Sequence, residues 1–545
     1  MSSTRARRPG PKRRAARLLL LAASVAVMGA VMAATSPARA LPREQARRLG
    51  EVDQALRELR VEDAEEQVVP LLGRHATDAD VLLAAARVRF HQGEYDEAVG
   101  KLEASLARRP AGPPEADPRP AMLELYRSTR DATSRYVEAR SEDGRFVIRH
   151  APGRDRHLVA YALRALEGAD RALQEELGFR MPGPVRLEIY PTARSLAEVS
   201  TLSVEAIERT GTIALCKWDK LMVTSPRALL RGYPWMDTIA HEYVHLVLTR
   251  ASRDRAPVWL QEGVAKFLER RWREPEARPH LAPAMDALLR RKARERELIP
   301  FDRIHPSIAL LPSQEDAALA FAQVSTFIAT FYAEHGRAGL QAAVERIAAG
   351  ADAREALAAV AGEPWARLED RWRAGLRAEA PPDDAPRLLR MRLRHGEGEG
   401  DESPEVAERA RRYLRLGDLL WARRRSGAAA REYERALEVA PGDPIIASRL
   451  ARAAVAGGQA ERAVEALEPV AERYPEHAPT QAVLARALSL TGDTARARRF
   501  AERAIRLNPF DPAPHCVLAE VAEDEAERAT ETRRCRELGG TSGAR

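Results

Sequence analysis

Residues 237–250 read DTIAHEYVHLVLTR, and this stretch has the pattern of a helix with one buried face. Its apolar residues recur at the spacing that places side chains on one side of a helix. The same geometry brings His241 and His245 side by side, so both imidazoles can bind one metal ion. Glu242 points from the same turn toward the open side of such an ion. The stretch therefore predicts a metal site with a carboxylate beside it.

A metal site that activates water uses three protein ligands and keeps one position open, so the sequence must supply a third ligand. Sixteen residues separate His245 from Glu262, which lies in PVWLQEGVA at 257–265. Pro257 is well placed as the first residue of a second helix. Glu262 is therefore a candidate third ligand beside His241 and His245, for a metal such as Zn²⁺.

Two further carboxylates lie near these ligands in the sequence. Asp254 falls in the polar turn between the two helices and is interpreted as a solvated loop or capping residue. Glu269 lies seven residues after Glu262 and so on nearly the same helix face. Because arginines follow at 270, 271 and 273, we expect Glu269 to form a surface ion pair.

A repeat with a period of 34 residues runs through the C-terminal third of the chain. Two sets of residues keep this spacing: Pro441, Pro475 and Pro509, and Ala429, Ala463 and Ala497. This is the tetratricopeptide period, which predicts stacked pairs of antiparallel helices. A similar unit near the N-terminus has Ala86, Gly93, Tyr95, Ala98 and Pro110 in the corresponding places.

The middle of the chain begins with short runs rich in β-branched residues, bounded by Gly, Pro or charged turns. These runs, at 145–150, 185–190, 212–216 and 221–224, predict strands. An amphipathic helix is expected at about 157–177, and the part after Met236 is almost wholly helical. A small sheet followed by helices predicts an α+β domain, whose sheet edge could bind an extended peptide by strand addition.

These patterns divide the chain into five parts. We expect a signal peptide at 1–40, an N-terminal helical repeat region at 41–135, the α+β domain at 136–380, a linker at 381–409 and C-terminal repeats at 410–540.

The signal peptide is inferred from a basic start, an apolar run at 18–34 and the cleavage pattern Ala38-Arg39-Ala40. An uncleaved anchor is the alternative, because the apolar run of 17 residues approaches the length that spans a bilayer. Both readings predict an exported protein of the periplasm or cell envelope, or a secreted one. Contact with a membrane is expected only through this segment, if it stays uncleaved.

The net charge of +7 belongs to the leader, because residues 1–40 carry eight Lys or Arg and no Asp or Glu, which leaves −1 for the remainder. Since the other arginines alternate with acidic residues, no nucleic-acid partner is expected. Three cysteines exclude a disulfide-stapled scaffold and a cysteine-based zinc cluster. In an exported protein Cys516 and Cys535 could form a disulfide, and Cys216 is interpreted as a small core residue.

The two motif helices resemble those of the gluzincin metallopeptidases, specifically the bacterial peptidase MA-like domains often found with tetratricopeptide repeats. The resemblance rests on HEYVH at 241–245 and WLQEGVA at 259–265, and residues 350–376 are similar to the closing helices of that group. It implies a gluzincin-like α+β domain flanked by all-α repeats, with Glu262 as the third zinc ligand.

The resemblance also implies an activity, that of a zinc metalloendopeptidase or an aminopeptidase-like hydrolase. A zinc-activated water would hydrolyse the peptide bond, with Glu242 as the general base. The substrate would be a protein or peptide, and the repeats would recruit it or a protein partner.

Position 321 departs from the family's pattern. A tyrosine that stabilises the oxyanion commonly begins an aromatic-Ala-Gln-Ser segment on a later helix, and here Phe321 takes its place. Tyr332 lies eleven residues further on, which on a helix is about 16 Å away. Tyr233 and His335 are other candidate donors. A zinc-binding repeat scaffold of the cell envelope, with weak or absent catalysis, is therefore the alternative function.

Overall fold

The computed structural model describes residues 43–113, 115–304, 307–378, 380–381, 385–394 and 402–541, so the expected signal peptide lies outside the described residues. The chain forms two compact units, Met1–Ala55 with Asp63–Arg127, and Leu56–Glu62 with Ser128–Arg545. Among the described helices, none combines the length and apolar character needed to cross a bilayer.

The first unit consists of paired helices, as the N-terminal pattern predicts. Its elements are α2 (Arg43–Arg57), α3 (Val61–Arg74), α4 (Ala79–Gln92), α5 (Tyr95–Arg108) and the start of α6 (Arg119–Thr133). Helix α4 begins at the Asp78 cap and ends at Gly93, whose φ of 81° is left-handed. The Phe90 and Tyr126 rings stack with centroids 3.8 Å apart and join α4 to α6.

The second unit begins with a mixed sheet in the order β1-β2-β3-β5-β4. Its strands are β1 (Val137–Arg140), β2 (Phe146–His150), β3 (Val185–Tyr190), β4 (Ala214–Lys217) and β5 (Lys220–Thr224). The three central strands are parallel, and both edge strands pair antiparallel to their neighbours. Four strands fall on the predicted runs, whereas β1 has no apolar run because it is a mostly exposed edge strand.

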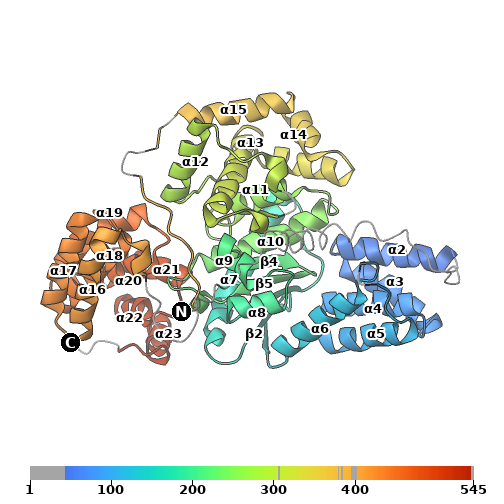
Figure 1. Cartoon of the computed structure of the whole chain (residues 1–545), viewed down its shortest axis with the longest axis horizontal. Helices are drawn as coiled ribbons and strands as arrows, with labels where there is room; N and C mark the ends of the chain where they lie inside the picture. The colour runs from blue at the N-terminus through green and yellow to red at the C-terminus, as the bar shows by residue number, and fades with distance from the viewer. Residues whose placement is uncertain are drawn as a thin grey trace, which may run out of the picture. The chain divides into compact units, whose positions relative to one another are not determined.

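Helices lie between and after the strands (Figure 1). They are η1 (Arg154–Leu158), α7 (Val159–Leu177), α8 (Ala193–Glu198), α9 (Val204–Thr210), η2 (Pro226–Ala228), α10 (Trp235–Ala251), α11 (Val258–Leu268), α12 (Pro283–Glu295), η3 (Phe301–Ile304), η4 (Ile308–Leu310), α13 (Gln314–Ala348), α14 (Ala353–Ala361) and α15 (Trp365–Ala378). Helices α7, α8 and α10 pack on the sheet, and α10 also packs on α7. Helix α13 is broken at Gly336, where φ is 61° and ψ is −166°.

The C-terminal part is a stack of helix pairs, which agrees with the 34-residue period. After η5 (Ser403–Glu405) it contains α16 (Glu408–Ala422), α17 (Ser426–Val439), α18 (Pro444–Ala456), α19 (Ala460–Arg473), α20 (Ala478–Leu490), α21 (Thr494–Leu507), α22 (Pro512–Val521) and α23 (Glu525–Glu537). A Cβ on Gly417 would lie 2.4 Å from the Tyr433 ring, so the helix crossing needs glycine. Cys516 and Cys535 are joined by a disulfide.

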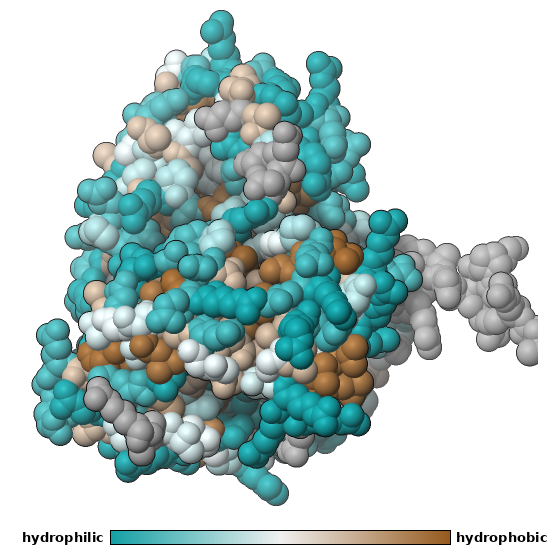
Figure 2. Space-filling model, turned by 90° about the vertical axis from the view of Figure 1, so that its left-hand side faces the viewer, coloured by the Kyte–Doolittle hydropathy of each residue, from teal (hydrophilic) through white to brown (hydrophobic). Residues whose placement is uncertain are grey.

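The face that includes the C-terminal repeats is mostly hydrophilic, with several hydrophobic patches (Figure 2). Large exposed apolar side chains of the repeats include Leu416 and Leu419 on α16. Exposed apolar residues in small numbers are normal on protein surfaces.

Candidate metal centre

Helix α10 carries both histidines and is buried on almost every side, which differs from the predicted single buried face. The reason is that α7, the sheet, α11 and α21 all pack around it. Trp235 at its start is fully buried. The helix is therefore held firmly, and the positions of His241 and His245 are fixed with it.

Helix α11 brings Glu262 to the histidines because it lies very close to α13. A Cβ on Gly263 would lie 2.8 Å from the Val324 carbonyl oxygen and 2.8 Å from the Ile328 side chain. Trp259 anchors the same helix by stacking on Phe301, with ring centroids 5.1 Å apart. The glycine that follows Glu262 thus permits the close packing that positions this carboxylate.

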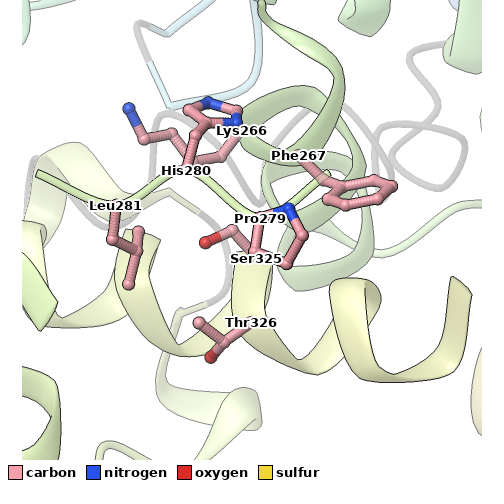
Figure 3. A pocket seen from close by; sticks show the side chains of 7 residues that line it. All are labelled: Lys266, Phe267, Pro279, His280, Leu281, Ser325 and Thr326. Atoms are coloured by element: carbon pink, nitrogen blue, oxygen red, sulfur yellow. The ribbon is translucent and has the colours of Figure 1, made fainter. Parts of the chain in front are cut away.

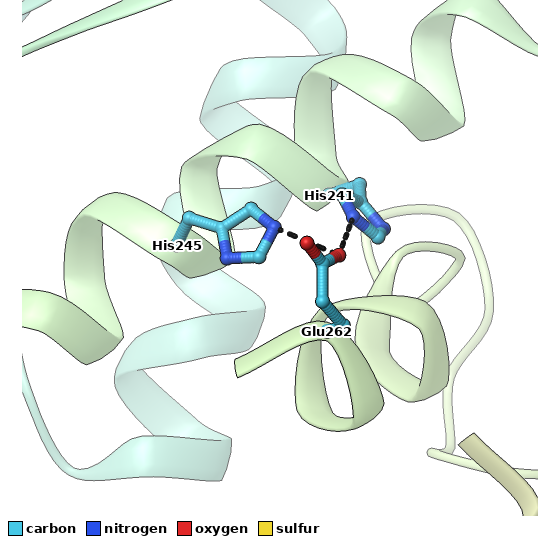
Figure 4. Close-up of side chains that lie close together, drawn as sticks. All are labelled: His241, His245 and Glu262. Carbon is cyan, nitrogen blue, oxygen red and sulfur yellow. Dashed lines mark hydrogen bonds and ion pairs between the residues drawn. The ribbon is translucent and has the colours of Figure 1, made fainter. Parts of the chain in front are cut away.

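The three predicted ligands converge on one point (Figure 4). Glu262 Oε2 lies 3.3 Å from His241 Nε2 and 3.3 Å from His245 Nε2, and one ligand atom of each residue lies within 4.8 Å of the others. Tetrahedral ligands at about 2.0–2.1 Å from zinc are about 3.3 Å apart. Two imidazoles and one carboxylate at this separation fit a divalent metal such as zinc.

The charges of these groups in the metal-free protein follow from their mutual contacts. Burial lowers the pKa of His241, but hydrogen bonds to Glu262 and Glu269 outweigh it and raise the pKa to about 10. Burial raises the pKa of Glu262, but His245 and His241 outweigh it and lower the pKa to about 2. The metal-free site therefore holds a proton that a metal ion must displace.

Glu242 is a buried carboxylate beside these ligands. Burial raises its pKa, and the neighbouring His245 and His241 oppose the rise. A carboxylate with a raised pKa is a better proton acceptor near neutral pH than an exposed one.

The environment of Glu269 contradicts its predicted role in a surface ion pair. It is 6% exposed, and its Oε2 lies 3.2 Å from His241 Nδ1. The prediction was wrong because α11 ends at Leu268, so Glu269 lies in the turn, directed at α10, while Arg271 and Arg273 pair with Glu175 and Asp237. A carboxylate bound to Nδ1 orients the ring and leaves Nε2 for the metal.

Lys266 and His280 complete the surroundings of Glu269. Lys266 Nζ donates to Glu269 Oε1 at 2.5 Å, and His280 Nε2 lies 3.2 Å from the same oxygen. A cavity of about 10 Å³ lies beside them, lined also by Phe267, Ser325 and Thr326 (Figure 3). It has room for about one water molecule.

Phe321 lies beside the predicted metal ligands, in the position where the family pattern has a tyrosine. Its ring meets the His241 ring edge to face, with centroids 5.9 Å apart. The other candidate donors have different partners: the Tyr233 hydroxyl donates to the Thr224 carbonyl, and the Tyr332 hydroxyl donates to Glu176 at 2.6 Å. His335 packs against Phe331 with ring centroids 4.8 Å apart. The position expected to hold an oxyanion-stabilising hydroxyl therefore holds the apolar ring of Phe321.

The edge strand β4 lies next to α10, and among the described residues it pairs only with β5. Cys216 on this strand is half-buried and packs against the hydrophobic core, which agrees with its interpretation as a small core residue. Burial raises the pKa of its thiol, and the nearby charge of Glu242 adds to the rise, so the thiol stays protonated.

Asp254 lies exposed in the turn after α10 with a φ of 57°, which agrees with its interpretation as a loop residue.

Family models match three parts of the chain. Residues 167–378 match the Peptidase MA superfamily, and tetratricopeptide repeat models match 420–476, 454–521 and 49–113. These matches confirm the resemblance drawn from the two motifs and the 34-residue period. A search of curated proteins found no match.

Similar solved structures include a thermophilic TPR protein from Thermus thermophilus, with 26% identity over 24% of this chain and 72% of that one and a TM-score of 0.22. The Sgt2 TPR domain from Aspergillus fumigatus has 24% identity over 27% of this chain and 91% of that one, with a TM-score of 0.20. Yeast LTA4 hydrolase in complex with bestatin has 12% identity over 74% of this chain and 67% of that one, with a TM-score of 0.29. TM-scores this low do not establish a shared fold.

Proposed function

Because the chain contains a Peptidase MA superfamily domain flanked by tetratricopeptide repeats, we propose that it is an exported zinc metallopeptidase of the gluzincin type. The observation that carries the proposal is the convergence of His241, His245 and Glu262, with Glu242 beside them. A purely structural metal site has no need of a buried general base.

When bound, zinc supplies a Lewis acid that polarises a substrate carbonyl and makes water more acidic. The Glu242 carboxylate accepts the proton of the attacking water and then donates it to the nitrogen of the departing amine. Glu269 holds the His241 ring in orientation throughout. The free edge of β4 can hydrogen-bond an extended peptide as an added strand beside α10.

The repeats would recruit a protein substrate or a protein partner, and the leader at 1–40 would export the chain to the periplasm or cell envelope. Phe321 limits the rate, because it provides no hydrogen bond to the developing oxyanion. Loss of one such donor costs about 10²- to 10³-fold in other enzymes.

The alternative is a zinc-binding scaffold of the cell envelope with weak or absent catalysis. Phe321 favours it, and Glu242 argues against it. Both functions predict a bound metal, so metal content alone does not separate them.

The deciding experiment compares residues 41–545 with the Glu242→Gln variant, both loaded with zinc, in the cleavage of an unfolded protein. The peptidase function predicts that Glu242→Gln retains zinc and loses activity by about 10²-fold or more. Equal rates for the two proteins would leave the scaffold function.

A further inference from the structure

Residues 385–394, between the peptidase domain and the C-terminal repeats, are bound along the domain. Leu229 and Leu393 form an antiparallel bridge, and the Leu230 N–H donates to the Arg392 carbonyl at 3.0 Å. The Gln314 side chain accepts from the Met391 N–H at 2.8 Å and donates to the Met391 carbonyl at 3.0 Å. The backbone of this segment is therefore fixed.

This segment forms one wall of a cavity of about 130 Å³, which we call the junction cavity. Its other walls come from the residues before α10, the start of α12 and the turn between α19 and α20, within 229–234, 282–285 and 473–477. The space holds several water molecules or a small organic group.

The lining contains five arginines and one carboxylate, that of Glu476, so the walls carry excess positive charge. Two of the arginines have carboxylate partners: Arg231 donates to Glu402 at 3.1 Å, and Arg387 donates to Asp443 at 2.9 Å. Arg390 is exposed and Arg392 is half-buried, and within the described ranges neither guanidinium has a carboxylate partner. Both arginines are thus free to bind an anionic group.

His477 in the same wall has an unused hydrogen-bonding position. The ring is 1% exposed. Its Nδ1 lies 2.7 Å from the Thr480 hydroxyl, while Nε2 has no hydrogen-bond partner among the described residues. Burial lowers the pKa of His477 well below its ordinary value, and nearby arginines lower it further, so the ring is neutral. The ring therefore adds no charge to the wall.

The chemistry of the walls selects among anions. Apolar and aromatic side chains such as Met285, Leu389 and Tyr474 make up much of the lining. Such walls disfavour phosphate, which is strongly hydrated and multiply charged. A carboxylate carries one charge and matches the planar guanidinium with two parallel hydrogen bonds.

We propose that the junction cavity binds an organic carboxylate with an apolar body, held by Arg390 and Arg392. Two sources have this chemistry, the C-terminal residue of a peptide and a free aliphatic acid. The site touches both the peptidase domain and the repeats, and its occupation requires no catalysis.

The test measures binding by isothermal titration calorimetry to residues 41–545 carrying Glu242→Gln, so that peptides stay intact. The probes are acetyl-Ala-Leu-Leu with a free carboxylate, the same peptide as its amide, hexanoate and inorganic phosphate. We expect the peptide acid or hexanoate to bind and the amide to bind about tenfold more weakly or not at all. A tighter peptide acid identifies a peptide C-terminus as the source, and tighter hexanoate identifies a free acid.

Substitutions test whether the acid binds in the junction cavity. Arg390→Gln with Arg392→Gln should weaken binding by about tenfold or more. Arg409→Gln with Arg415→Gln removes the same charge from exposed positions outside the cavity and should change nothing. Any of four results would overturn the proposal. The peptide acid and its amide bind equally, phosphate binds as tightly as the acids, neither acid binds, or Arg390→Gln/Arg392→Gln binds the acids as tightly as the parent protein.

Discussion

Glu269 is the residue that fixes the orientation of His241. It contacts Nδ1 of the imidazole while Lys266 and His280 hold its other oxygen. The carboxylate therefore both positions the ring and strengthens it as a ligand. Local sequence did not reveal this, because the contact joins residues 28 positions apart across a turn.

Replacing Glu269 with Gln should weaken zinc binding by about tenfold, because the variant keeps the side-chain shape and loses the charge beside His241. Competition with a chromophoric chelator measures the affinity. Glu276→Gln, an exposed change in the same loop, is the control and should leave the affinity unchanged. If the two variants bind zinc equally well, Glu269 has no part in holding the ligand.

Phe321→Tyr should raise kcat/KM for peptide cleavage by about 10- to 100-fold, because it adds a hydroxyl to the ring that meets His241. Zinc content should stay the same. The double variant Glu242→Gln/Phe321→Tyr should show no gain, since the general base is absent. A slower Phe321→Tyr enzyme with full zinc would contradict the assignment of this position to the oxyanion.

At the scale of elements, the β4–β5 hairpin presents the free edge beside α10. Its turn residues Trp218 and Asp219 have φ of 54° and 55°, the left-handed values of a tight two-residue turn. Burial raises the pKa of Asp219 to about 7, which Arg186 opposes only in part. Its Oδ1 has no hydrogen-bond partner in the part of the chain that the structure describes.

Asp219→Asn should stabilise the fold at pH 8 by about 1–3 kcal/mol and have little effect at pH 4. The folded state prefers protonated Asp219, so this contribution is complete below the ordinary pKa near 3.8 and is lost as the pH rises through about 7. Asparagine is neutral throughout and also tolerates left-handed φ. Urea unfolding at both pH values measures the difference.

Asp370→Asn removes one charge at an exposed position on α15 and serves as the control. It should leave the pH dependence of unfolding as in the wild type. A pH dependence of Asp219→Asn equal to that of the wild type would show that Asp219 does not cause it.

At the scale of the whole second unit, the segment before α10 is attached to the end of α21. The Tyr233 N–H donates to the Leu507 carbonyl at 2.9 Å, and Trp235 Nε1–H donates to the Ile505 carbonyl at 3.4 Å. Gly232 has a φ of 71°, and a Cβ there would lie 2.2 Å from the Leu507 oxygen. The C-terminal repeats therefore support the start of the helix that carries both histidines.

Gly232→Ala should destabilise the protein by about 2–4 kcal/mol, since it adds a backbone clash to the cost of left-handed alanine. Gly458→Ala is the matched control, because Gly458 has a φ of 76° and open space around its Cβ position. The control should cost only about 1 kcal/mol. Thermal unfolding compares the two, and equal losses would show that the contact with Leu507 is not tight.

The sequence by itself determined the features that depend on local periodicity. Helical spacing placed His241 and His245 on one side of α10, the 34-residue period gave the helix pairs, and β-branched runs gave the four strands from β2 to β5. Each of these is encoded within a few turns of chain, so it can be recognised without knowing what packs against it.

Only the tertiary structure decided which distant residues meet. Glu269 was assigned to the surface because its neighbours are arginines, yet the turn after α11 buries it against His241. Helix α10 was assigned one buried face, yet the sheet and the repeats enclose it. The junction cavity gathers four segments from across 229–477. Such contacts arise from packing between elements, and the free energy of that packing has no signature in local spacing.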